Sequence, residues 1–234
     1  FVFKSLLIAK KHHFDLVYTR LLWVAALGSS IKLPVILELH DRPVGRMGSR
    51  LLKWFCRSKS KKRIVLITHA LKKILEDENA LVFNPDEVII APDGVDLERY
   101  EDEFTPSQAR MKLGIEDRLT AVYSGGFYEG RGLDTLLLLA QNFPQVQFIW
   151  VGGKEDIVRK WLQKISSAGI ENVLLTGFVN NQDVPLYQHA ADILLMPYSK
   201  TISGSSGGNI ADVSSPMKMF EYMAAGRVIL TSNI

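Results

Sequence analysis

Hydrophobic positions in the second half of the chain alternate between short continuous runs and helical spacing. Continuous apolar runs are typical of strands that are buried on both faces of a parallel sheet. We predict strands at Leu119–Ser124, Gln147–Val151, Val173–Leu175, Asp192–Met196 and Arg227–Leu230, and helices at Leu133–Asn142, Asp156–Ser167, Gln182–Ala190 and Pro216–Ala225. This alternation predicts an α/β fold with a Rossmann-like, doubly wound parallel sheet.

The first half shows the same alternation with shorter runs. We predict strands at Phe14–Thr19, Val35–Leu39, Ile64–Thr68 and Val88–Ala91, and helical segments within 1–13 and at Trp23–Ala26, Arg50–Arg57 and Leu71–Asp77. The acidic stretch Pro92–Gly114 contains two prolines and interrupts the rhythm, so we interpret it as an inter-domain connection. The predicted organisation is a partial N-terminal domain with linker (residues 1–105) and an incomplete C-terminal domain (residues 106–234).

Composition and charge narrow the class of protein. Of the 234 residues, 47% are apolar, which suffices for two cores, and the net charge of +3 is too small to predict nucleic-acid binding. The single cysteine, Cys56, excludes an internal disulfide and predicts a reducing, cytoplasmic location. No apolar run approaches the ~18 residues of a membrane span. Because the chain starts inside a helical pattern and stops just after a predicted strand, we expect a fragment of a longer protein, truncated at both ends.

A helix at Pro216–Ala225 carries the most informative residues. Ser215 and Pro216 suit its N-cap and first position, and Gly226 suits a left-handed stop after its last turn. Lys218 places a cation in the first turn, where the helix dipole prefers an anion, and Glu221 follows it on the same face. One interpretation is a solvated Lys–Glu pair. The other is a phosphate bound at the helix start and a sugar hydroxyl bound by the carboxylate.

Two loops after predicted strands extend this second interpretation. The glycine-rich turn Ser124–Gly132 would let the backbone at Gly125 and Gly126 approach a phosphate, with Arg131 adding a charged contact; a plain flexible loop is the alternative. At Gly177–Val179, Phe178 or Val179 would lie against a base, or Phe178 would be an ordinary core residue.

The first half offers fewer candidates. His40 follows the strand Val35–Leu39 and is either a structural histidine or a donor to a developing charge. The basic run Arg57–Arg63 follows a helix containing Trp54 and is either a solvated edge or a contact for anionic lipid headgroups. No cluster of histidine, cysteine and carboxylate residues has metal-ligand spacing, so no metal site is predicted.

Taken in order, five segments resemble the group 1 (family 4) retaining glycosyltransferases, which have two facing Rossmann-like domains (GT-B fold). The resemblance covers nearly the whole chain. Its segments are Pro34–Asp41 ("P-I-V-x-T-x-H-D"), Ala91–Asp96 ("P-N-G-V-D"), Gly125–Gly132 ("G-R-L-x-x-x-K-G"), Leu175–Pro197 ("L-G-F-V…L-x-x-x-Y-x-x-A-D-x-x-x-x-P") and Ser215–Gly226 ("S-P-x-K-x-F-E-Y-M-A-A-G").

The resemblance implies roles for individual residues. Glu221 would bind the donor ribose, Arg131 would replace a diphosphate-binding lysine, and His40 would lie near the transferred sugar or the acceptor. The helix start, Ser215, Pro216, Met217 and Lys218, would hold the diphosphate, and Phe178 and Val179 would lie beside the base. Two positions depart from the family pattern: Val213 stands in place of a glutamate that contacts the donor sugar, and Gly126 in place of a diphosphate-binding arginine.

The resemblance implies a hexosyltransferase-like enzyme that moves a sugar, with retention and without a metal, from a nucleotide-diphosphate donor such as a UDP- or GDP-sugar. The acceptor would be a carbohydrate or a lipid-linked sugar in polysaccharide biosynthesis. A peripheral contact with the inner face of an anionic membrane is expected. Neither a cofactor nor a nucleic-acid partner is expected. The alternatives are a sugar-nucleotide epimerase of similar architecture and a non-catalytic nucleotide-sugar-binding protein.

Overall fold

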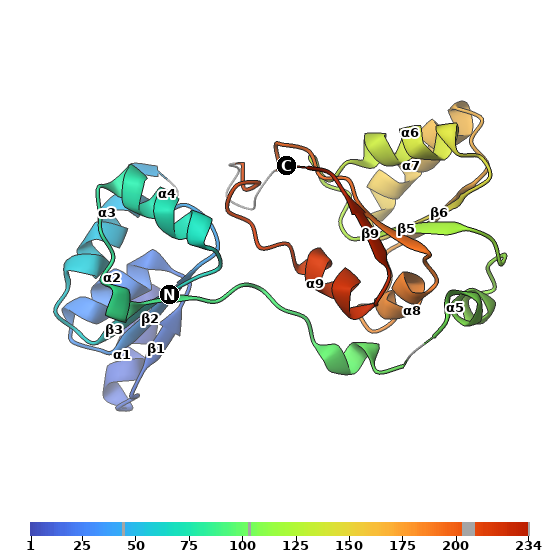
Figure 1. Ribbon diagram of the computed structural model, residues 1–234. Coiled ribbons are helices and arrows are strands. Elements are labelled where there is room, and N and C mark those ends of the chain that lie inside the picture. The colour runs from blue at the N-terminus through green and yellow to red at the C-terminus, as the bar shows by residue number, and fades with distance from the viewer. Residues whose placement is uncertain (44, 103, 203–208, 234) are drawn as a thin grey trace. The chain divides into compact units, whose positions relative to one another are not determined.

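The computed structural model describes residues 1–43, 45–102, 104–202 and 209–233, which form two compact units (Figure 1). Unit 1 consists of residues 1–93 together with the described residues 209–215 that precede the last helix. Unit 2 consists of the described residues of 94–202 and of 216–233. The division therefore lies at Asp93 rather than after residue 105, because the chain from Gly94 onward packs on unit 2.

Unit 1 is a four-stranded parallel sheet with the strand order β1-β2-β3-β4. Its strands are β1 (Val17–Thr19), β2 (Val35–Leu39), β3 (Lys62–Leu66) and β4 (Val88–Ile90), and its helices are α1 (Val2–Lys11), α2 (Leu22–Ser30), α3 (Gly45–Arg57) and α4 (His69–Asn79). Alternate residues of β2 and β3 are buried, and Leu37, Leu52 and Leu66 lie at the centre of the core.

Unit 2 is a five-stranded parallel sheet with the order β7-β6-β5-β8-β9. Its strands are β5 (Thr120–Ser124), β6 (Gln147–Val151), β7 (Val173–Gly177), β8 (Ile193–Met196) and β9 (Val228–Thr231), and its helices are α5 (Pro106–Leu113), α6 (Leu133–Asn142), α7 (Glu155–Ser167), α8 (Val184–His189) and α9 (Met217–Ala224). Figure 1 shows α6 and α7 on one side of β5 and β6, with α8 and α9 on the other. Every residue of β5 and β6 is buried, as the continuous apolar runs predict.

The strand order of unit 2 contains a topological switch point. The chain runs from β5 outward to β6 and β7, then returns to place β8 on the other side of β5. Ligands of such sheets bind beyond the carboxyl ends of the strands at this reversal. The loops after β5 and β8 are therefore the expected place for a site. The predicted fold class, two parallel α/β sheets, is confirmed.

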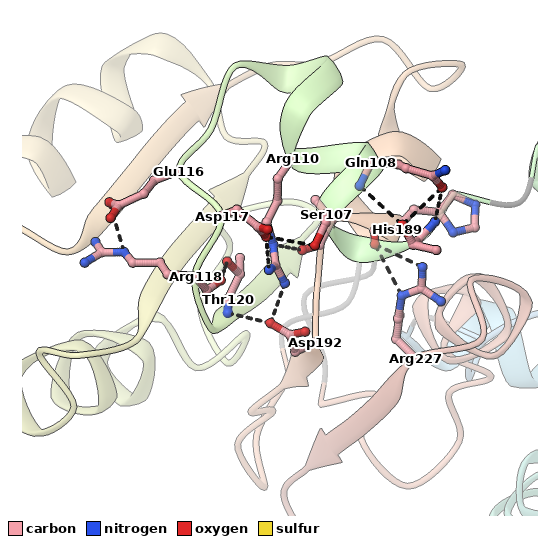
Figure 2. Close-up of polar contacts among 12 residues, drawn as sticks. Ser107, Gln108, Arg110, Glu116, Asp117, Arg118, Thr120, His189, Asp192 and Arg227 are labelled. Atoms are coloured by element: carbon pink, nitrogen blue, oxygen red, sulfur yellow. Dashed lines mark hydrogen bonds and ion pairs between the residues drawn. The ribbon is translucent and has the colours of Figure 1, made fainter.

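The stretch Pro92–Gly114 is not a plain connection, which corrects the interpretation made from sequence. It contains the 3-10 turn Leu97–Tyr100 and the helix α5, which begins with a capping box between Thr105 and Gln108. Figure 2 shows how Arg110 of α5 reaches the sheet of unit 2. Its guanidinium donates to the Ala190 carbonyl (2.9 Å) and contacts Asp192, whose carboxylate also accepts from the Thr120 amide (2.8 Å).

Two features are absent from the described residues. No helix within the described residues is long and apolar enough to cross a bilayer. Within the same residues, no group of histidine, cysteine and acidic side chains is arranged to hold a metal ion.

Candidate functional site

The site in unit 2 begins where β5 ends, at Gly125. This residue has φ of +141° and lies so close to Lys218 that an added Cβ would meet the Lys218 Nζ at 2.9 Å. A side chain at position 125 would thus displace the lysine. The loop after β5 and the helix α9 therefore meet at the switch point, as the sequence predicted.

Lys218 is buried, and among the residues that the structure describes its ammonium group has no hydrogen-bond partner. The Nζ atom lies 3.6 Å from the centre of the Tyr123 ring and 5.2 Å from that of Tyr198. Burial lowers the pKa of Lys218 well below its usual range, the charge of Arg131 lowers this pKa further, and Glu221 partly opposes the shift. The interpretation of Lys218 and Glu221 as a solvated surface pair is wrong, because the lysine is not in solvent.

Arg131 lies beside the same tyrosine. Its guanidinium carbon is 4.7 Å from the centre of the Tyr198 ring, so the ring of Tyr198 contacts both cations. Arg131 follows Gly130, whose carbonyl accepts from the Ser199 amide (3.0 Å), which holds the loop after β5 against the loop after β8. Two neighbouring cations with one partly buried carboxylate close by leave an excess of positive charge at the switch point.

Glu221 is held one turn further along α9. Its Oε2 accepts from the Gln188 Nε2 at 3.4 Å, and the same amide group donates to the Ser124 Oγ at 2.9 Å. The hydroxyl of Tyr100 donates to the other end of Gln188 at 2.7 Å. These contacts connect the carboxylate to α8, to β5 and to the 3-10 turn Leu97–Tyr100, and so hold it in position.

The N-terminus of α9 differs from the prediction by one residue. Pro216 is the N-cap, the helix begins at Met217, and no side chain in the described part of the chain caps it. Ser215 is not the cap, because its hydroxyl accepts instead from the Asp93 amide (3.0 Å) within unit 1. Gly226 follows the helix with φ of +65°, which confirms the predicted left-handed stop. An uncapped helix start with a buried lysine in its first turn suits an anion.

A pocket of about 560 Å³ opens beside this cluster and contains four of the predicted residues. Gly125 and Gly126 form one part of it, and Phe178 and Val179 form another. The Phe178 side chain is 80% exposed, so its interpretation as a core residue is wrong. Gly152 and Gly153 also line the pocket; an added Cβ on Gly152 would meet the Gly125 carbonyl oxygen at 2.3 Å, so this glycine is needed for packing.

The ring of Tyr128 lies close to Gly126. An added Cβ would lie 2.3 Å from the ring of Tyr128, which occupies the space that an arginine would need. The Gly126 carbonyl accepts from the Tyr123 hydroxyl at 2.9 Å, which fixes the ring beneath Lys218.

His40 belongs to unit 1 and lies in a pocket of about 380 Å³ at the carboxyl end of β2. Its Nε2 contacts Glu38, whose other carboxylate oxygen accepts from the Tyr18 hydroxyl. These two contacts lower the pKa of Glu38, with the Tyr18 hydroxyl as the larger cause. The ring of His40 is therefore oriented by its own strand.

Several site residues were missed from the sequence. Tyr123 ends a buried strand and Gln188 lies within α8, and neither has a neighbour in sequence that signals a polar role. Tyr198 directly follows the resembling segment Leu175–Pro197, but its contacts with Arg131 and Lys218 join three separate segments. Such contacts depend on the tertiary fold.

The fold and this cluster define a class: an α/β protein with two parallel Rossmann-like sheets of the GT-B glycosyltransferase type. Residues 118–234 match the family described as "Glycosyl transferases group 1", which is half of the chain. The chain therefore belongs to the group 1 glycosyltransferase family.

Individual relatives agree with this assignment. TuaH of Bacillus subtilis (strain 168), whose name assigns it to teichuronic acid biosynthesis as a glycosyltransferase, is 23% identical over 159 residues, covering 68% of this chain and 38% of TuaH. Anabaena Alr3699/HepE in complex with UDP and glucose has a TM-score of 0.73 at 22% identity, covering 98% of this chain and 61% of HepE. Sucrose-phosphate synthase from Thermosynechococcus elongatus has a TM-score of 0.73 at 16% identity, covering 100% and 59%. The chain thus spans between 38% and 61% of the length of these relatives.

Proposed function

We propose that the protein transfers a sugar, with retention of configuration, from a nucleotide-diphosphate donor to a carbohydrate or lipid-linked acceptor. One observation carries the proposal: within the described parts of the chain, the buried ammonium group of Lys218, in the first turn of α9, has no hydrogen-bond partner. A buried cation without a counter-ion is costly, and a bound diphosphate would supply the counter-ion. The HepE structures that contain UDP and UDP-glucose support a nucleotide-sugar as the donor.

Each element of the cluster has a task in this proposal. The diphosphate lies against Lys218, Arg131 and the first amides of α9, which would stabilise the charge that develops as the sugar leaves. The base enters the pocket between Gly125 and the pair Phe178 and Val179. Glu221 accepts a ribose hydroxyl. His40 lies in unit 1, outside this cluster, and its proposed contact with the transferred sugar or the acceptor rests on the family resemblance alone. Two cations and a helix start make the site independent of a metal ion in this proposal.

Nucleotide binding without divalent ions tests the phosphate assignment. We expect UDP or GDP to bind in the presence of a chelator, and Lys218→Ala and Arg131→Ala each to weaken binding by about tenfold or more, the loss of a charged hydrogen bond. Lys160→Ala, which removes an exposed cation of α7, is the matched control and should bind normally. Equal affinity of all four proteins would remove the phosphate site.

Product analysis with labelled nucleotide sugars tests the reaction. Transfer to an acceptor with the donor's anomeric configuration is expected. Epimerised nucleotide-sugar would identify a sugar-nucleotide epimerase instead. Tight nucleotide binding without any product would identify a non-catalytic binding protein, which the substitutions Val213 and Gly126 for the family's charged residues would explain.

A further inference from the structure

Positive charge is concentrated in unit 1. Its sequence holds 16 lysines and arginines against 10 acidic residues, for a net charge of +6, whereas unit 2 has 12 against 15, for a net charge of −3. The stretch from Arg42 to Leu75 contains 11 lysines and arginines and no aspartate or glutamate. A modest charge for the whole chain thus conceals a strongly basic segment.

Most of these cations are unpaired. Arg42, Lys62 and Lys72 form ion pairs with carboxylates from outside the segment. The other eight form no ion pair among the residues that the structure describes: Arg46, Arg50, Lys53, Arg57, Lys59, Lys61, Arg63 and Lys73. Their charge is therefore available to an external anionic partner.

The helix α3 displays several of these cations on its outer face. Its inner face buries Leu51, Leu52 and Phe55. The outer face exposes Arg46, Met47, Arg50, Trp54 and Arg57, and the Met47 and Trp54 side chains are 49% and 43% exposed. Residues 47, 50, 54 and 57 follow helical spacing, so apolar and cationic side chains share one stripe.

A hollow continues this stripe past the end of α3. It has a volume of about 680 Å³, and Lys32, Trp54, Arg57, Lys59 and Lys61 line it together with small polar residues. None of its lining residues is acidic. We define the α3 basic surface as the exposed α3 residues together with this hollow: Lys32, Arg46, Met47, Arg50, Trp54, Arg57, Lys59 and Lys61.

We propose that the α3 basic surface docks on the headgroups of an anionic lipid bilayer. Cations alone would suit any polyanion, but an exposed indole and a thioether among them suit the boundary between headgroups and acyl chains. Each lysine or arginine near an anionic bilayer strengthens binding about fivefold, and the attraction is screened by salt. The proposal does not depend on the donor site, because neither α3 nor the hollow belongs to it.

Flotation of the full chain with lipid vesicles tests the surface. We expect binding to vesicles that contain phosphatidylglycerol, little binding to pure phosphatidylcholine, and release at high salt. The triple variant Arg50→Ser, Arg57→Ser, Lys59→Ser should bind on the order of 100-fold more weakly. The control Lys4→Ser, Lys10→Ser, Lys11→Ser removes the same charge from exposed positions on α1 and should bind nearly as well as the original protein.

A matched pair of tryptophans tests the apolar part. Trp54 and Trp23 are 43% and 45% exposed, so Trp54→Ala and Trp23→Ala remove similar areas. Only Trp54→Ala should weaken vesicle binding. Equal losses in both triple variants, equal binding to neutral vesicles, no vesicle binding, or tighter binding to duplex DNA than to vesicles would each overturn the proposal. Circular dichroism of every variant establishes that it is folded.

Discussion

The protonation of Lys218 offers a test of the donor site at the scale of one residue. Burial lowers its pKa, and a bound diphosphate would favour the ammonium form and raise this pKa again. Binding should therefore take up a proton at pH values between the two pKa values. Affinity for UDP should fall as pH rises from the pKa of the free state to the pKa of the bound state, and it should be constant above that.

Calorimetry above about pH 7 measures this coupling, because the phosphate groups there are already ionised. The heat of UDP binding should vary with the ionisation enthalpy of the buffer, which reports the proton taken up. Lys218→Gln should abolish this dependence. A proton uptake that persists in Lys218→Gln would show that another group titrates.

Glu38 gives a second prediction, in unit 1. Its pKa is lowered, so its contacts stabilise the folded state above the ordinary glutamate pKa, and this stabilisation is lost as pH falls through the lowered value. Tyr18→Phe removes the larger cause. We expect the Glu38 pKa to rise and the free energy of unfolding to drop at pH 7, with no difference from the original protein in strong acid.

Carboxyl-carbon NMR titration and urea unfolding at two pH values check this prediction. His40→Gln should raise the Glu38 pKa less than Tyr18→Phe does, since its contact is the smaller cause. The reverse order would mean that the carboxylate is oriented mainly by the histidine. In that case Glu38 would act with His40 in its chemistry, rather than only orient its ring.

At the scale of elements, the sequence predicted most strands because apolar runs report burial. Gln147–Val151 is reproduced to the residue, and the helix Leu133–Asn142 likewise. Boundaries in unit 1 were less accurate: α3 begins at Gly45 rather than Arg50, since glycine and arginine there obscure the helical spacing. The missed α5 had a signal, because Thr105, Pro106 and Gln108 form its capping box.

The arginine that anchors α5 should be important for stability. Arg110 is only 4% exposed and joins α5 to Ala190 and Asp192 (Figure 2). Arg110→Ala should lower the free energy of unfolding of unit 2 by about 3 kcal/mol, as expected when one partner of a buried pair is removed. The partial exposure of Asp192 keeps the loss at the lower end of that range.

Urea denaturation measures this loss, with Asp117→Asn as the control. Asp117 also accepts from Arg110 (2.9 Å), but its side chain is 60% exposed. That control should cost less than about 1 kcal/mol, as for other exposed pairs. Similar losses in the two variants would place the stabilisation in the Asp117 contact rather than in the junction with β8.

At the scale of the whole molecule, the chain passes from unit 1 to unit 2 between Ser215 and Pro216, just before α9. The stretch Ser199–Ser215 is rich in serine and glycine, and its residues 203–208 lie outside the described residues. The described residues 209–215 belong to unit 1. Arg42 contacts the Asn209 carbonyl and Asp212 (both 3.1 Å), and Thr68 donates to the Val213 carbonyl (3.0 Å). No sequence pattern reveals these contacts, because they join residues far apart in the chain.

Val213, where the family pattern has a glutamate, is fully buried in the core of unit 1. A glutamate introduced here would be buried beside Leu66, Phe83 and other apolar residues, so Val213→Glu should destabilise unit 1 by at least about 3 kcal/mol. It should not strengthen donor binding. Hydrogen exchange read by mass spectrometry should show lost protection in β2 and β3 and unchanged protection in β5 and β6.

Val213→Ala is the control for Val213→Glu, because it shortens the side chain without adding charge. It should destabilise unit 1 by about 2 kcal/mol, within the range for truncated core residues. A stable Val213→Glu protein with tighter binding of a UDP-sugar would show that position 213 serves the donor after all. Stability and binding therefore separate the two uses of this position: the anchoring of a segment in unit 1, and the recognition of a sugar.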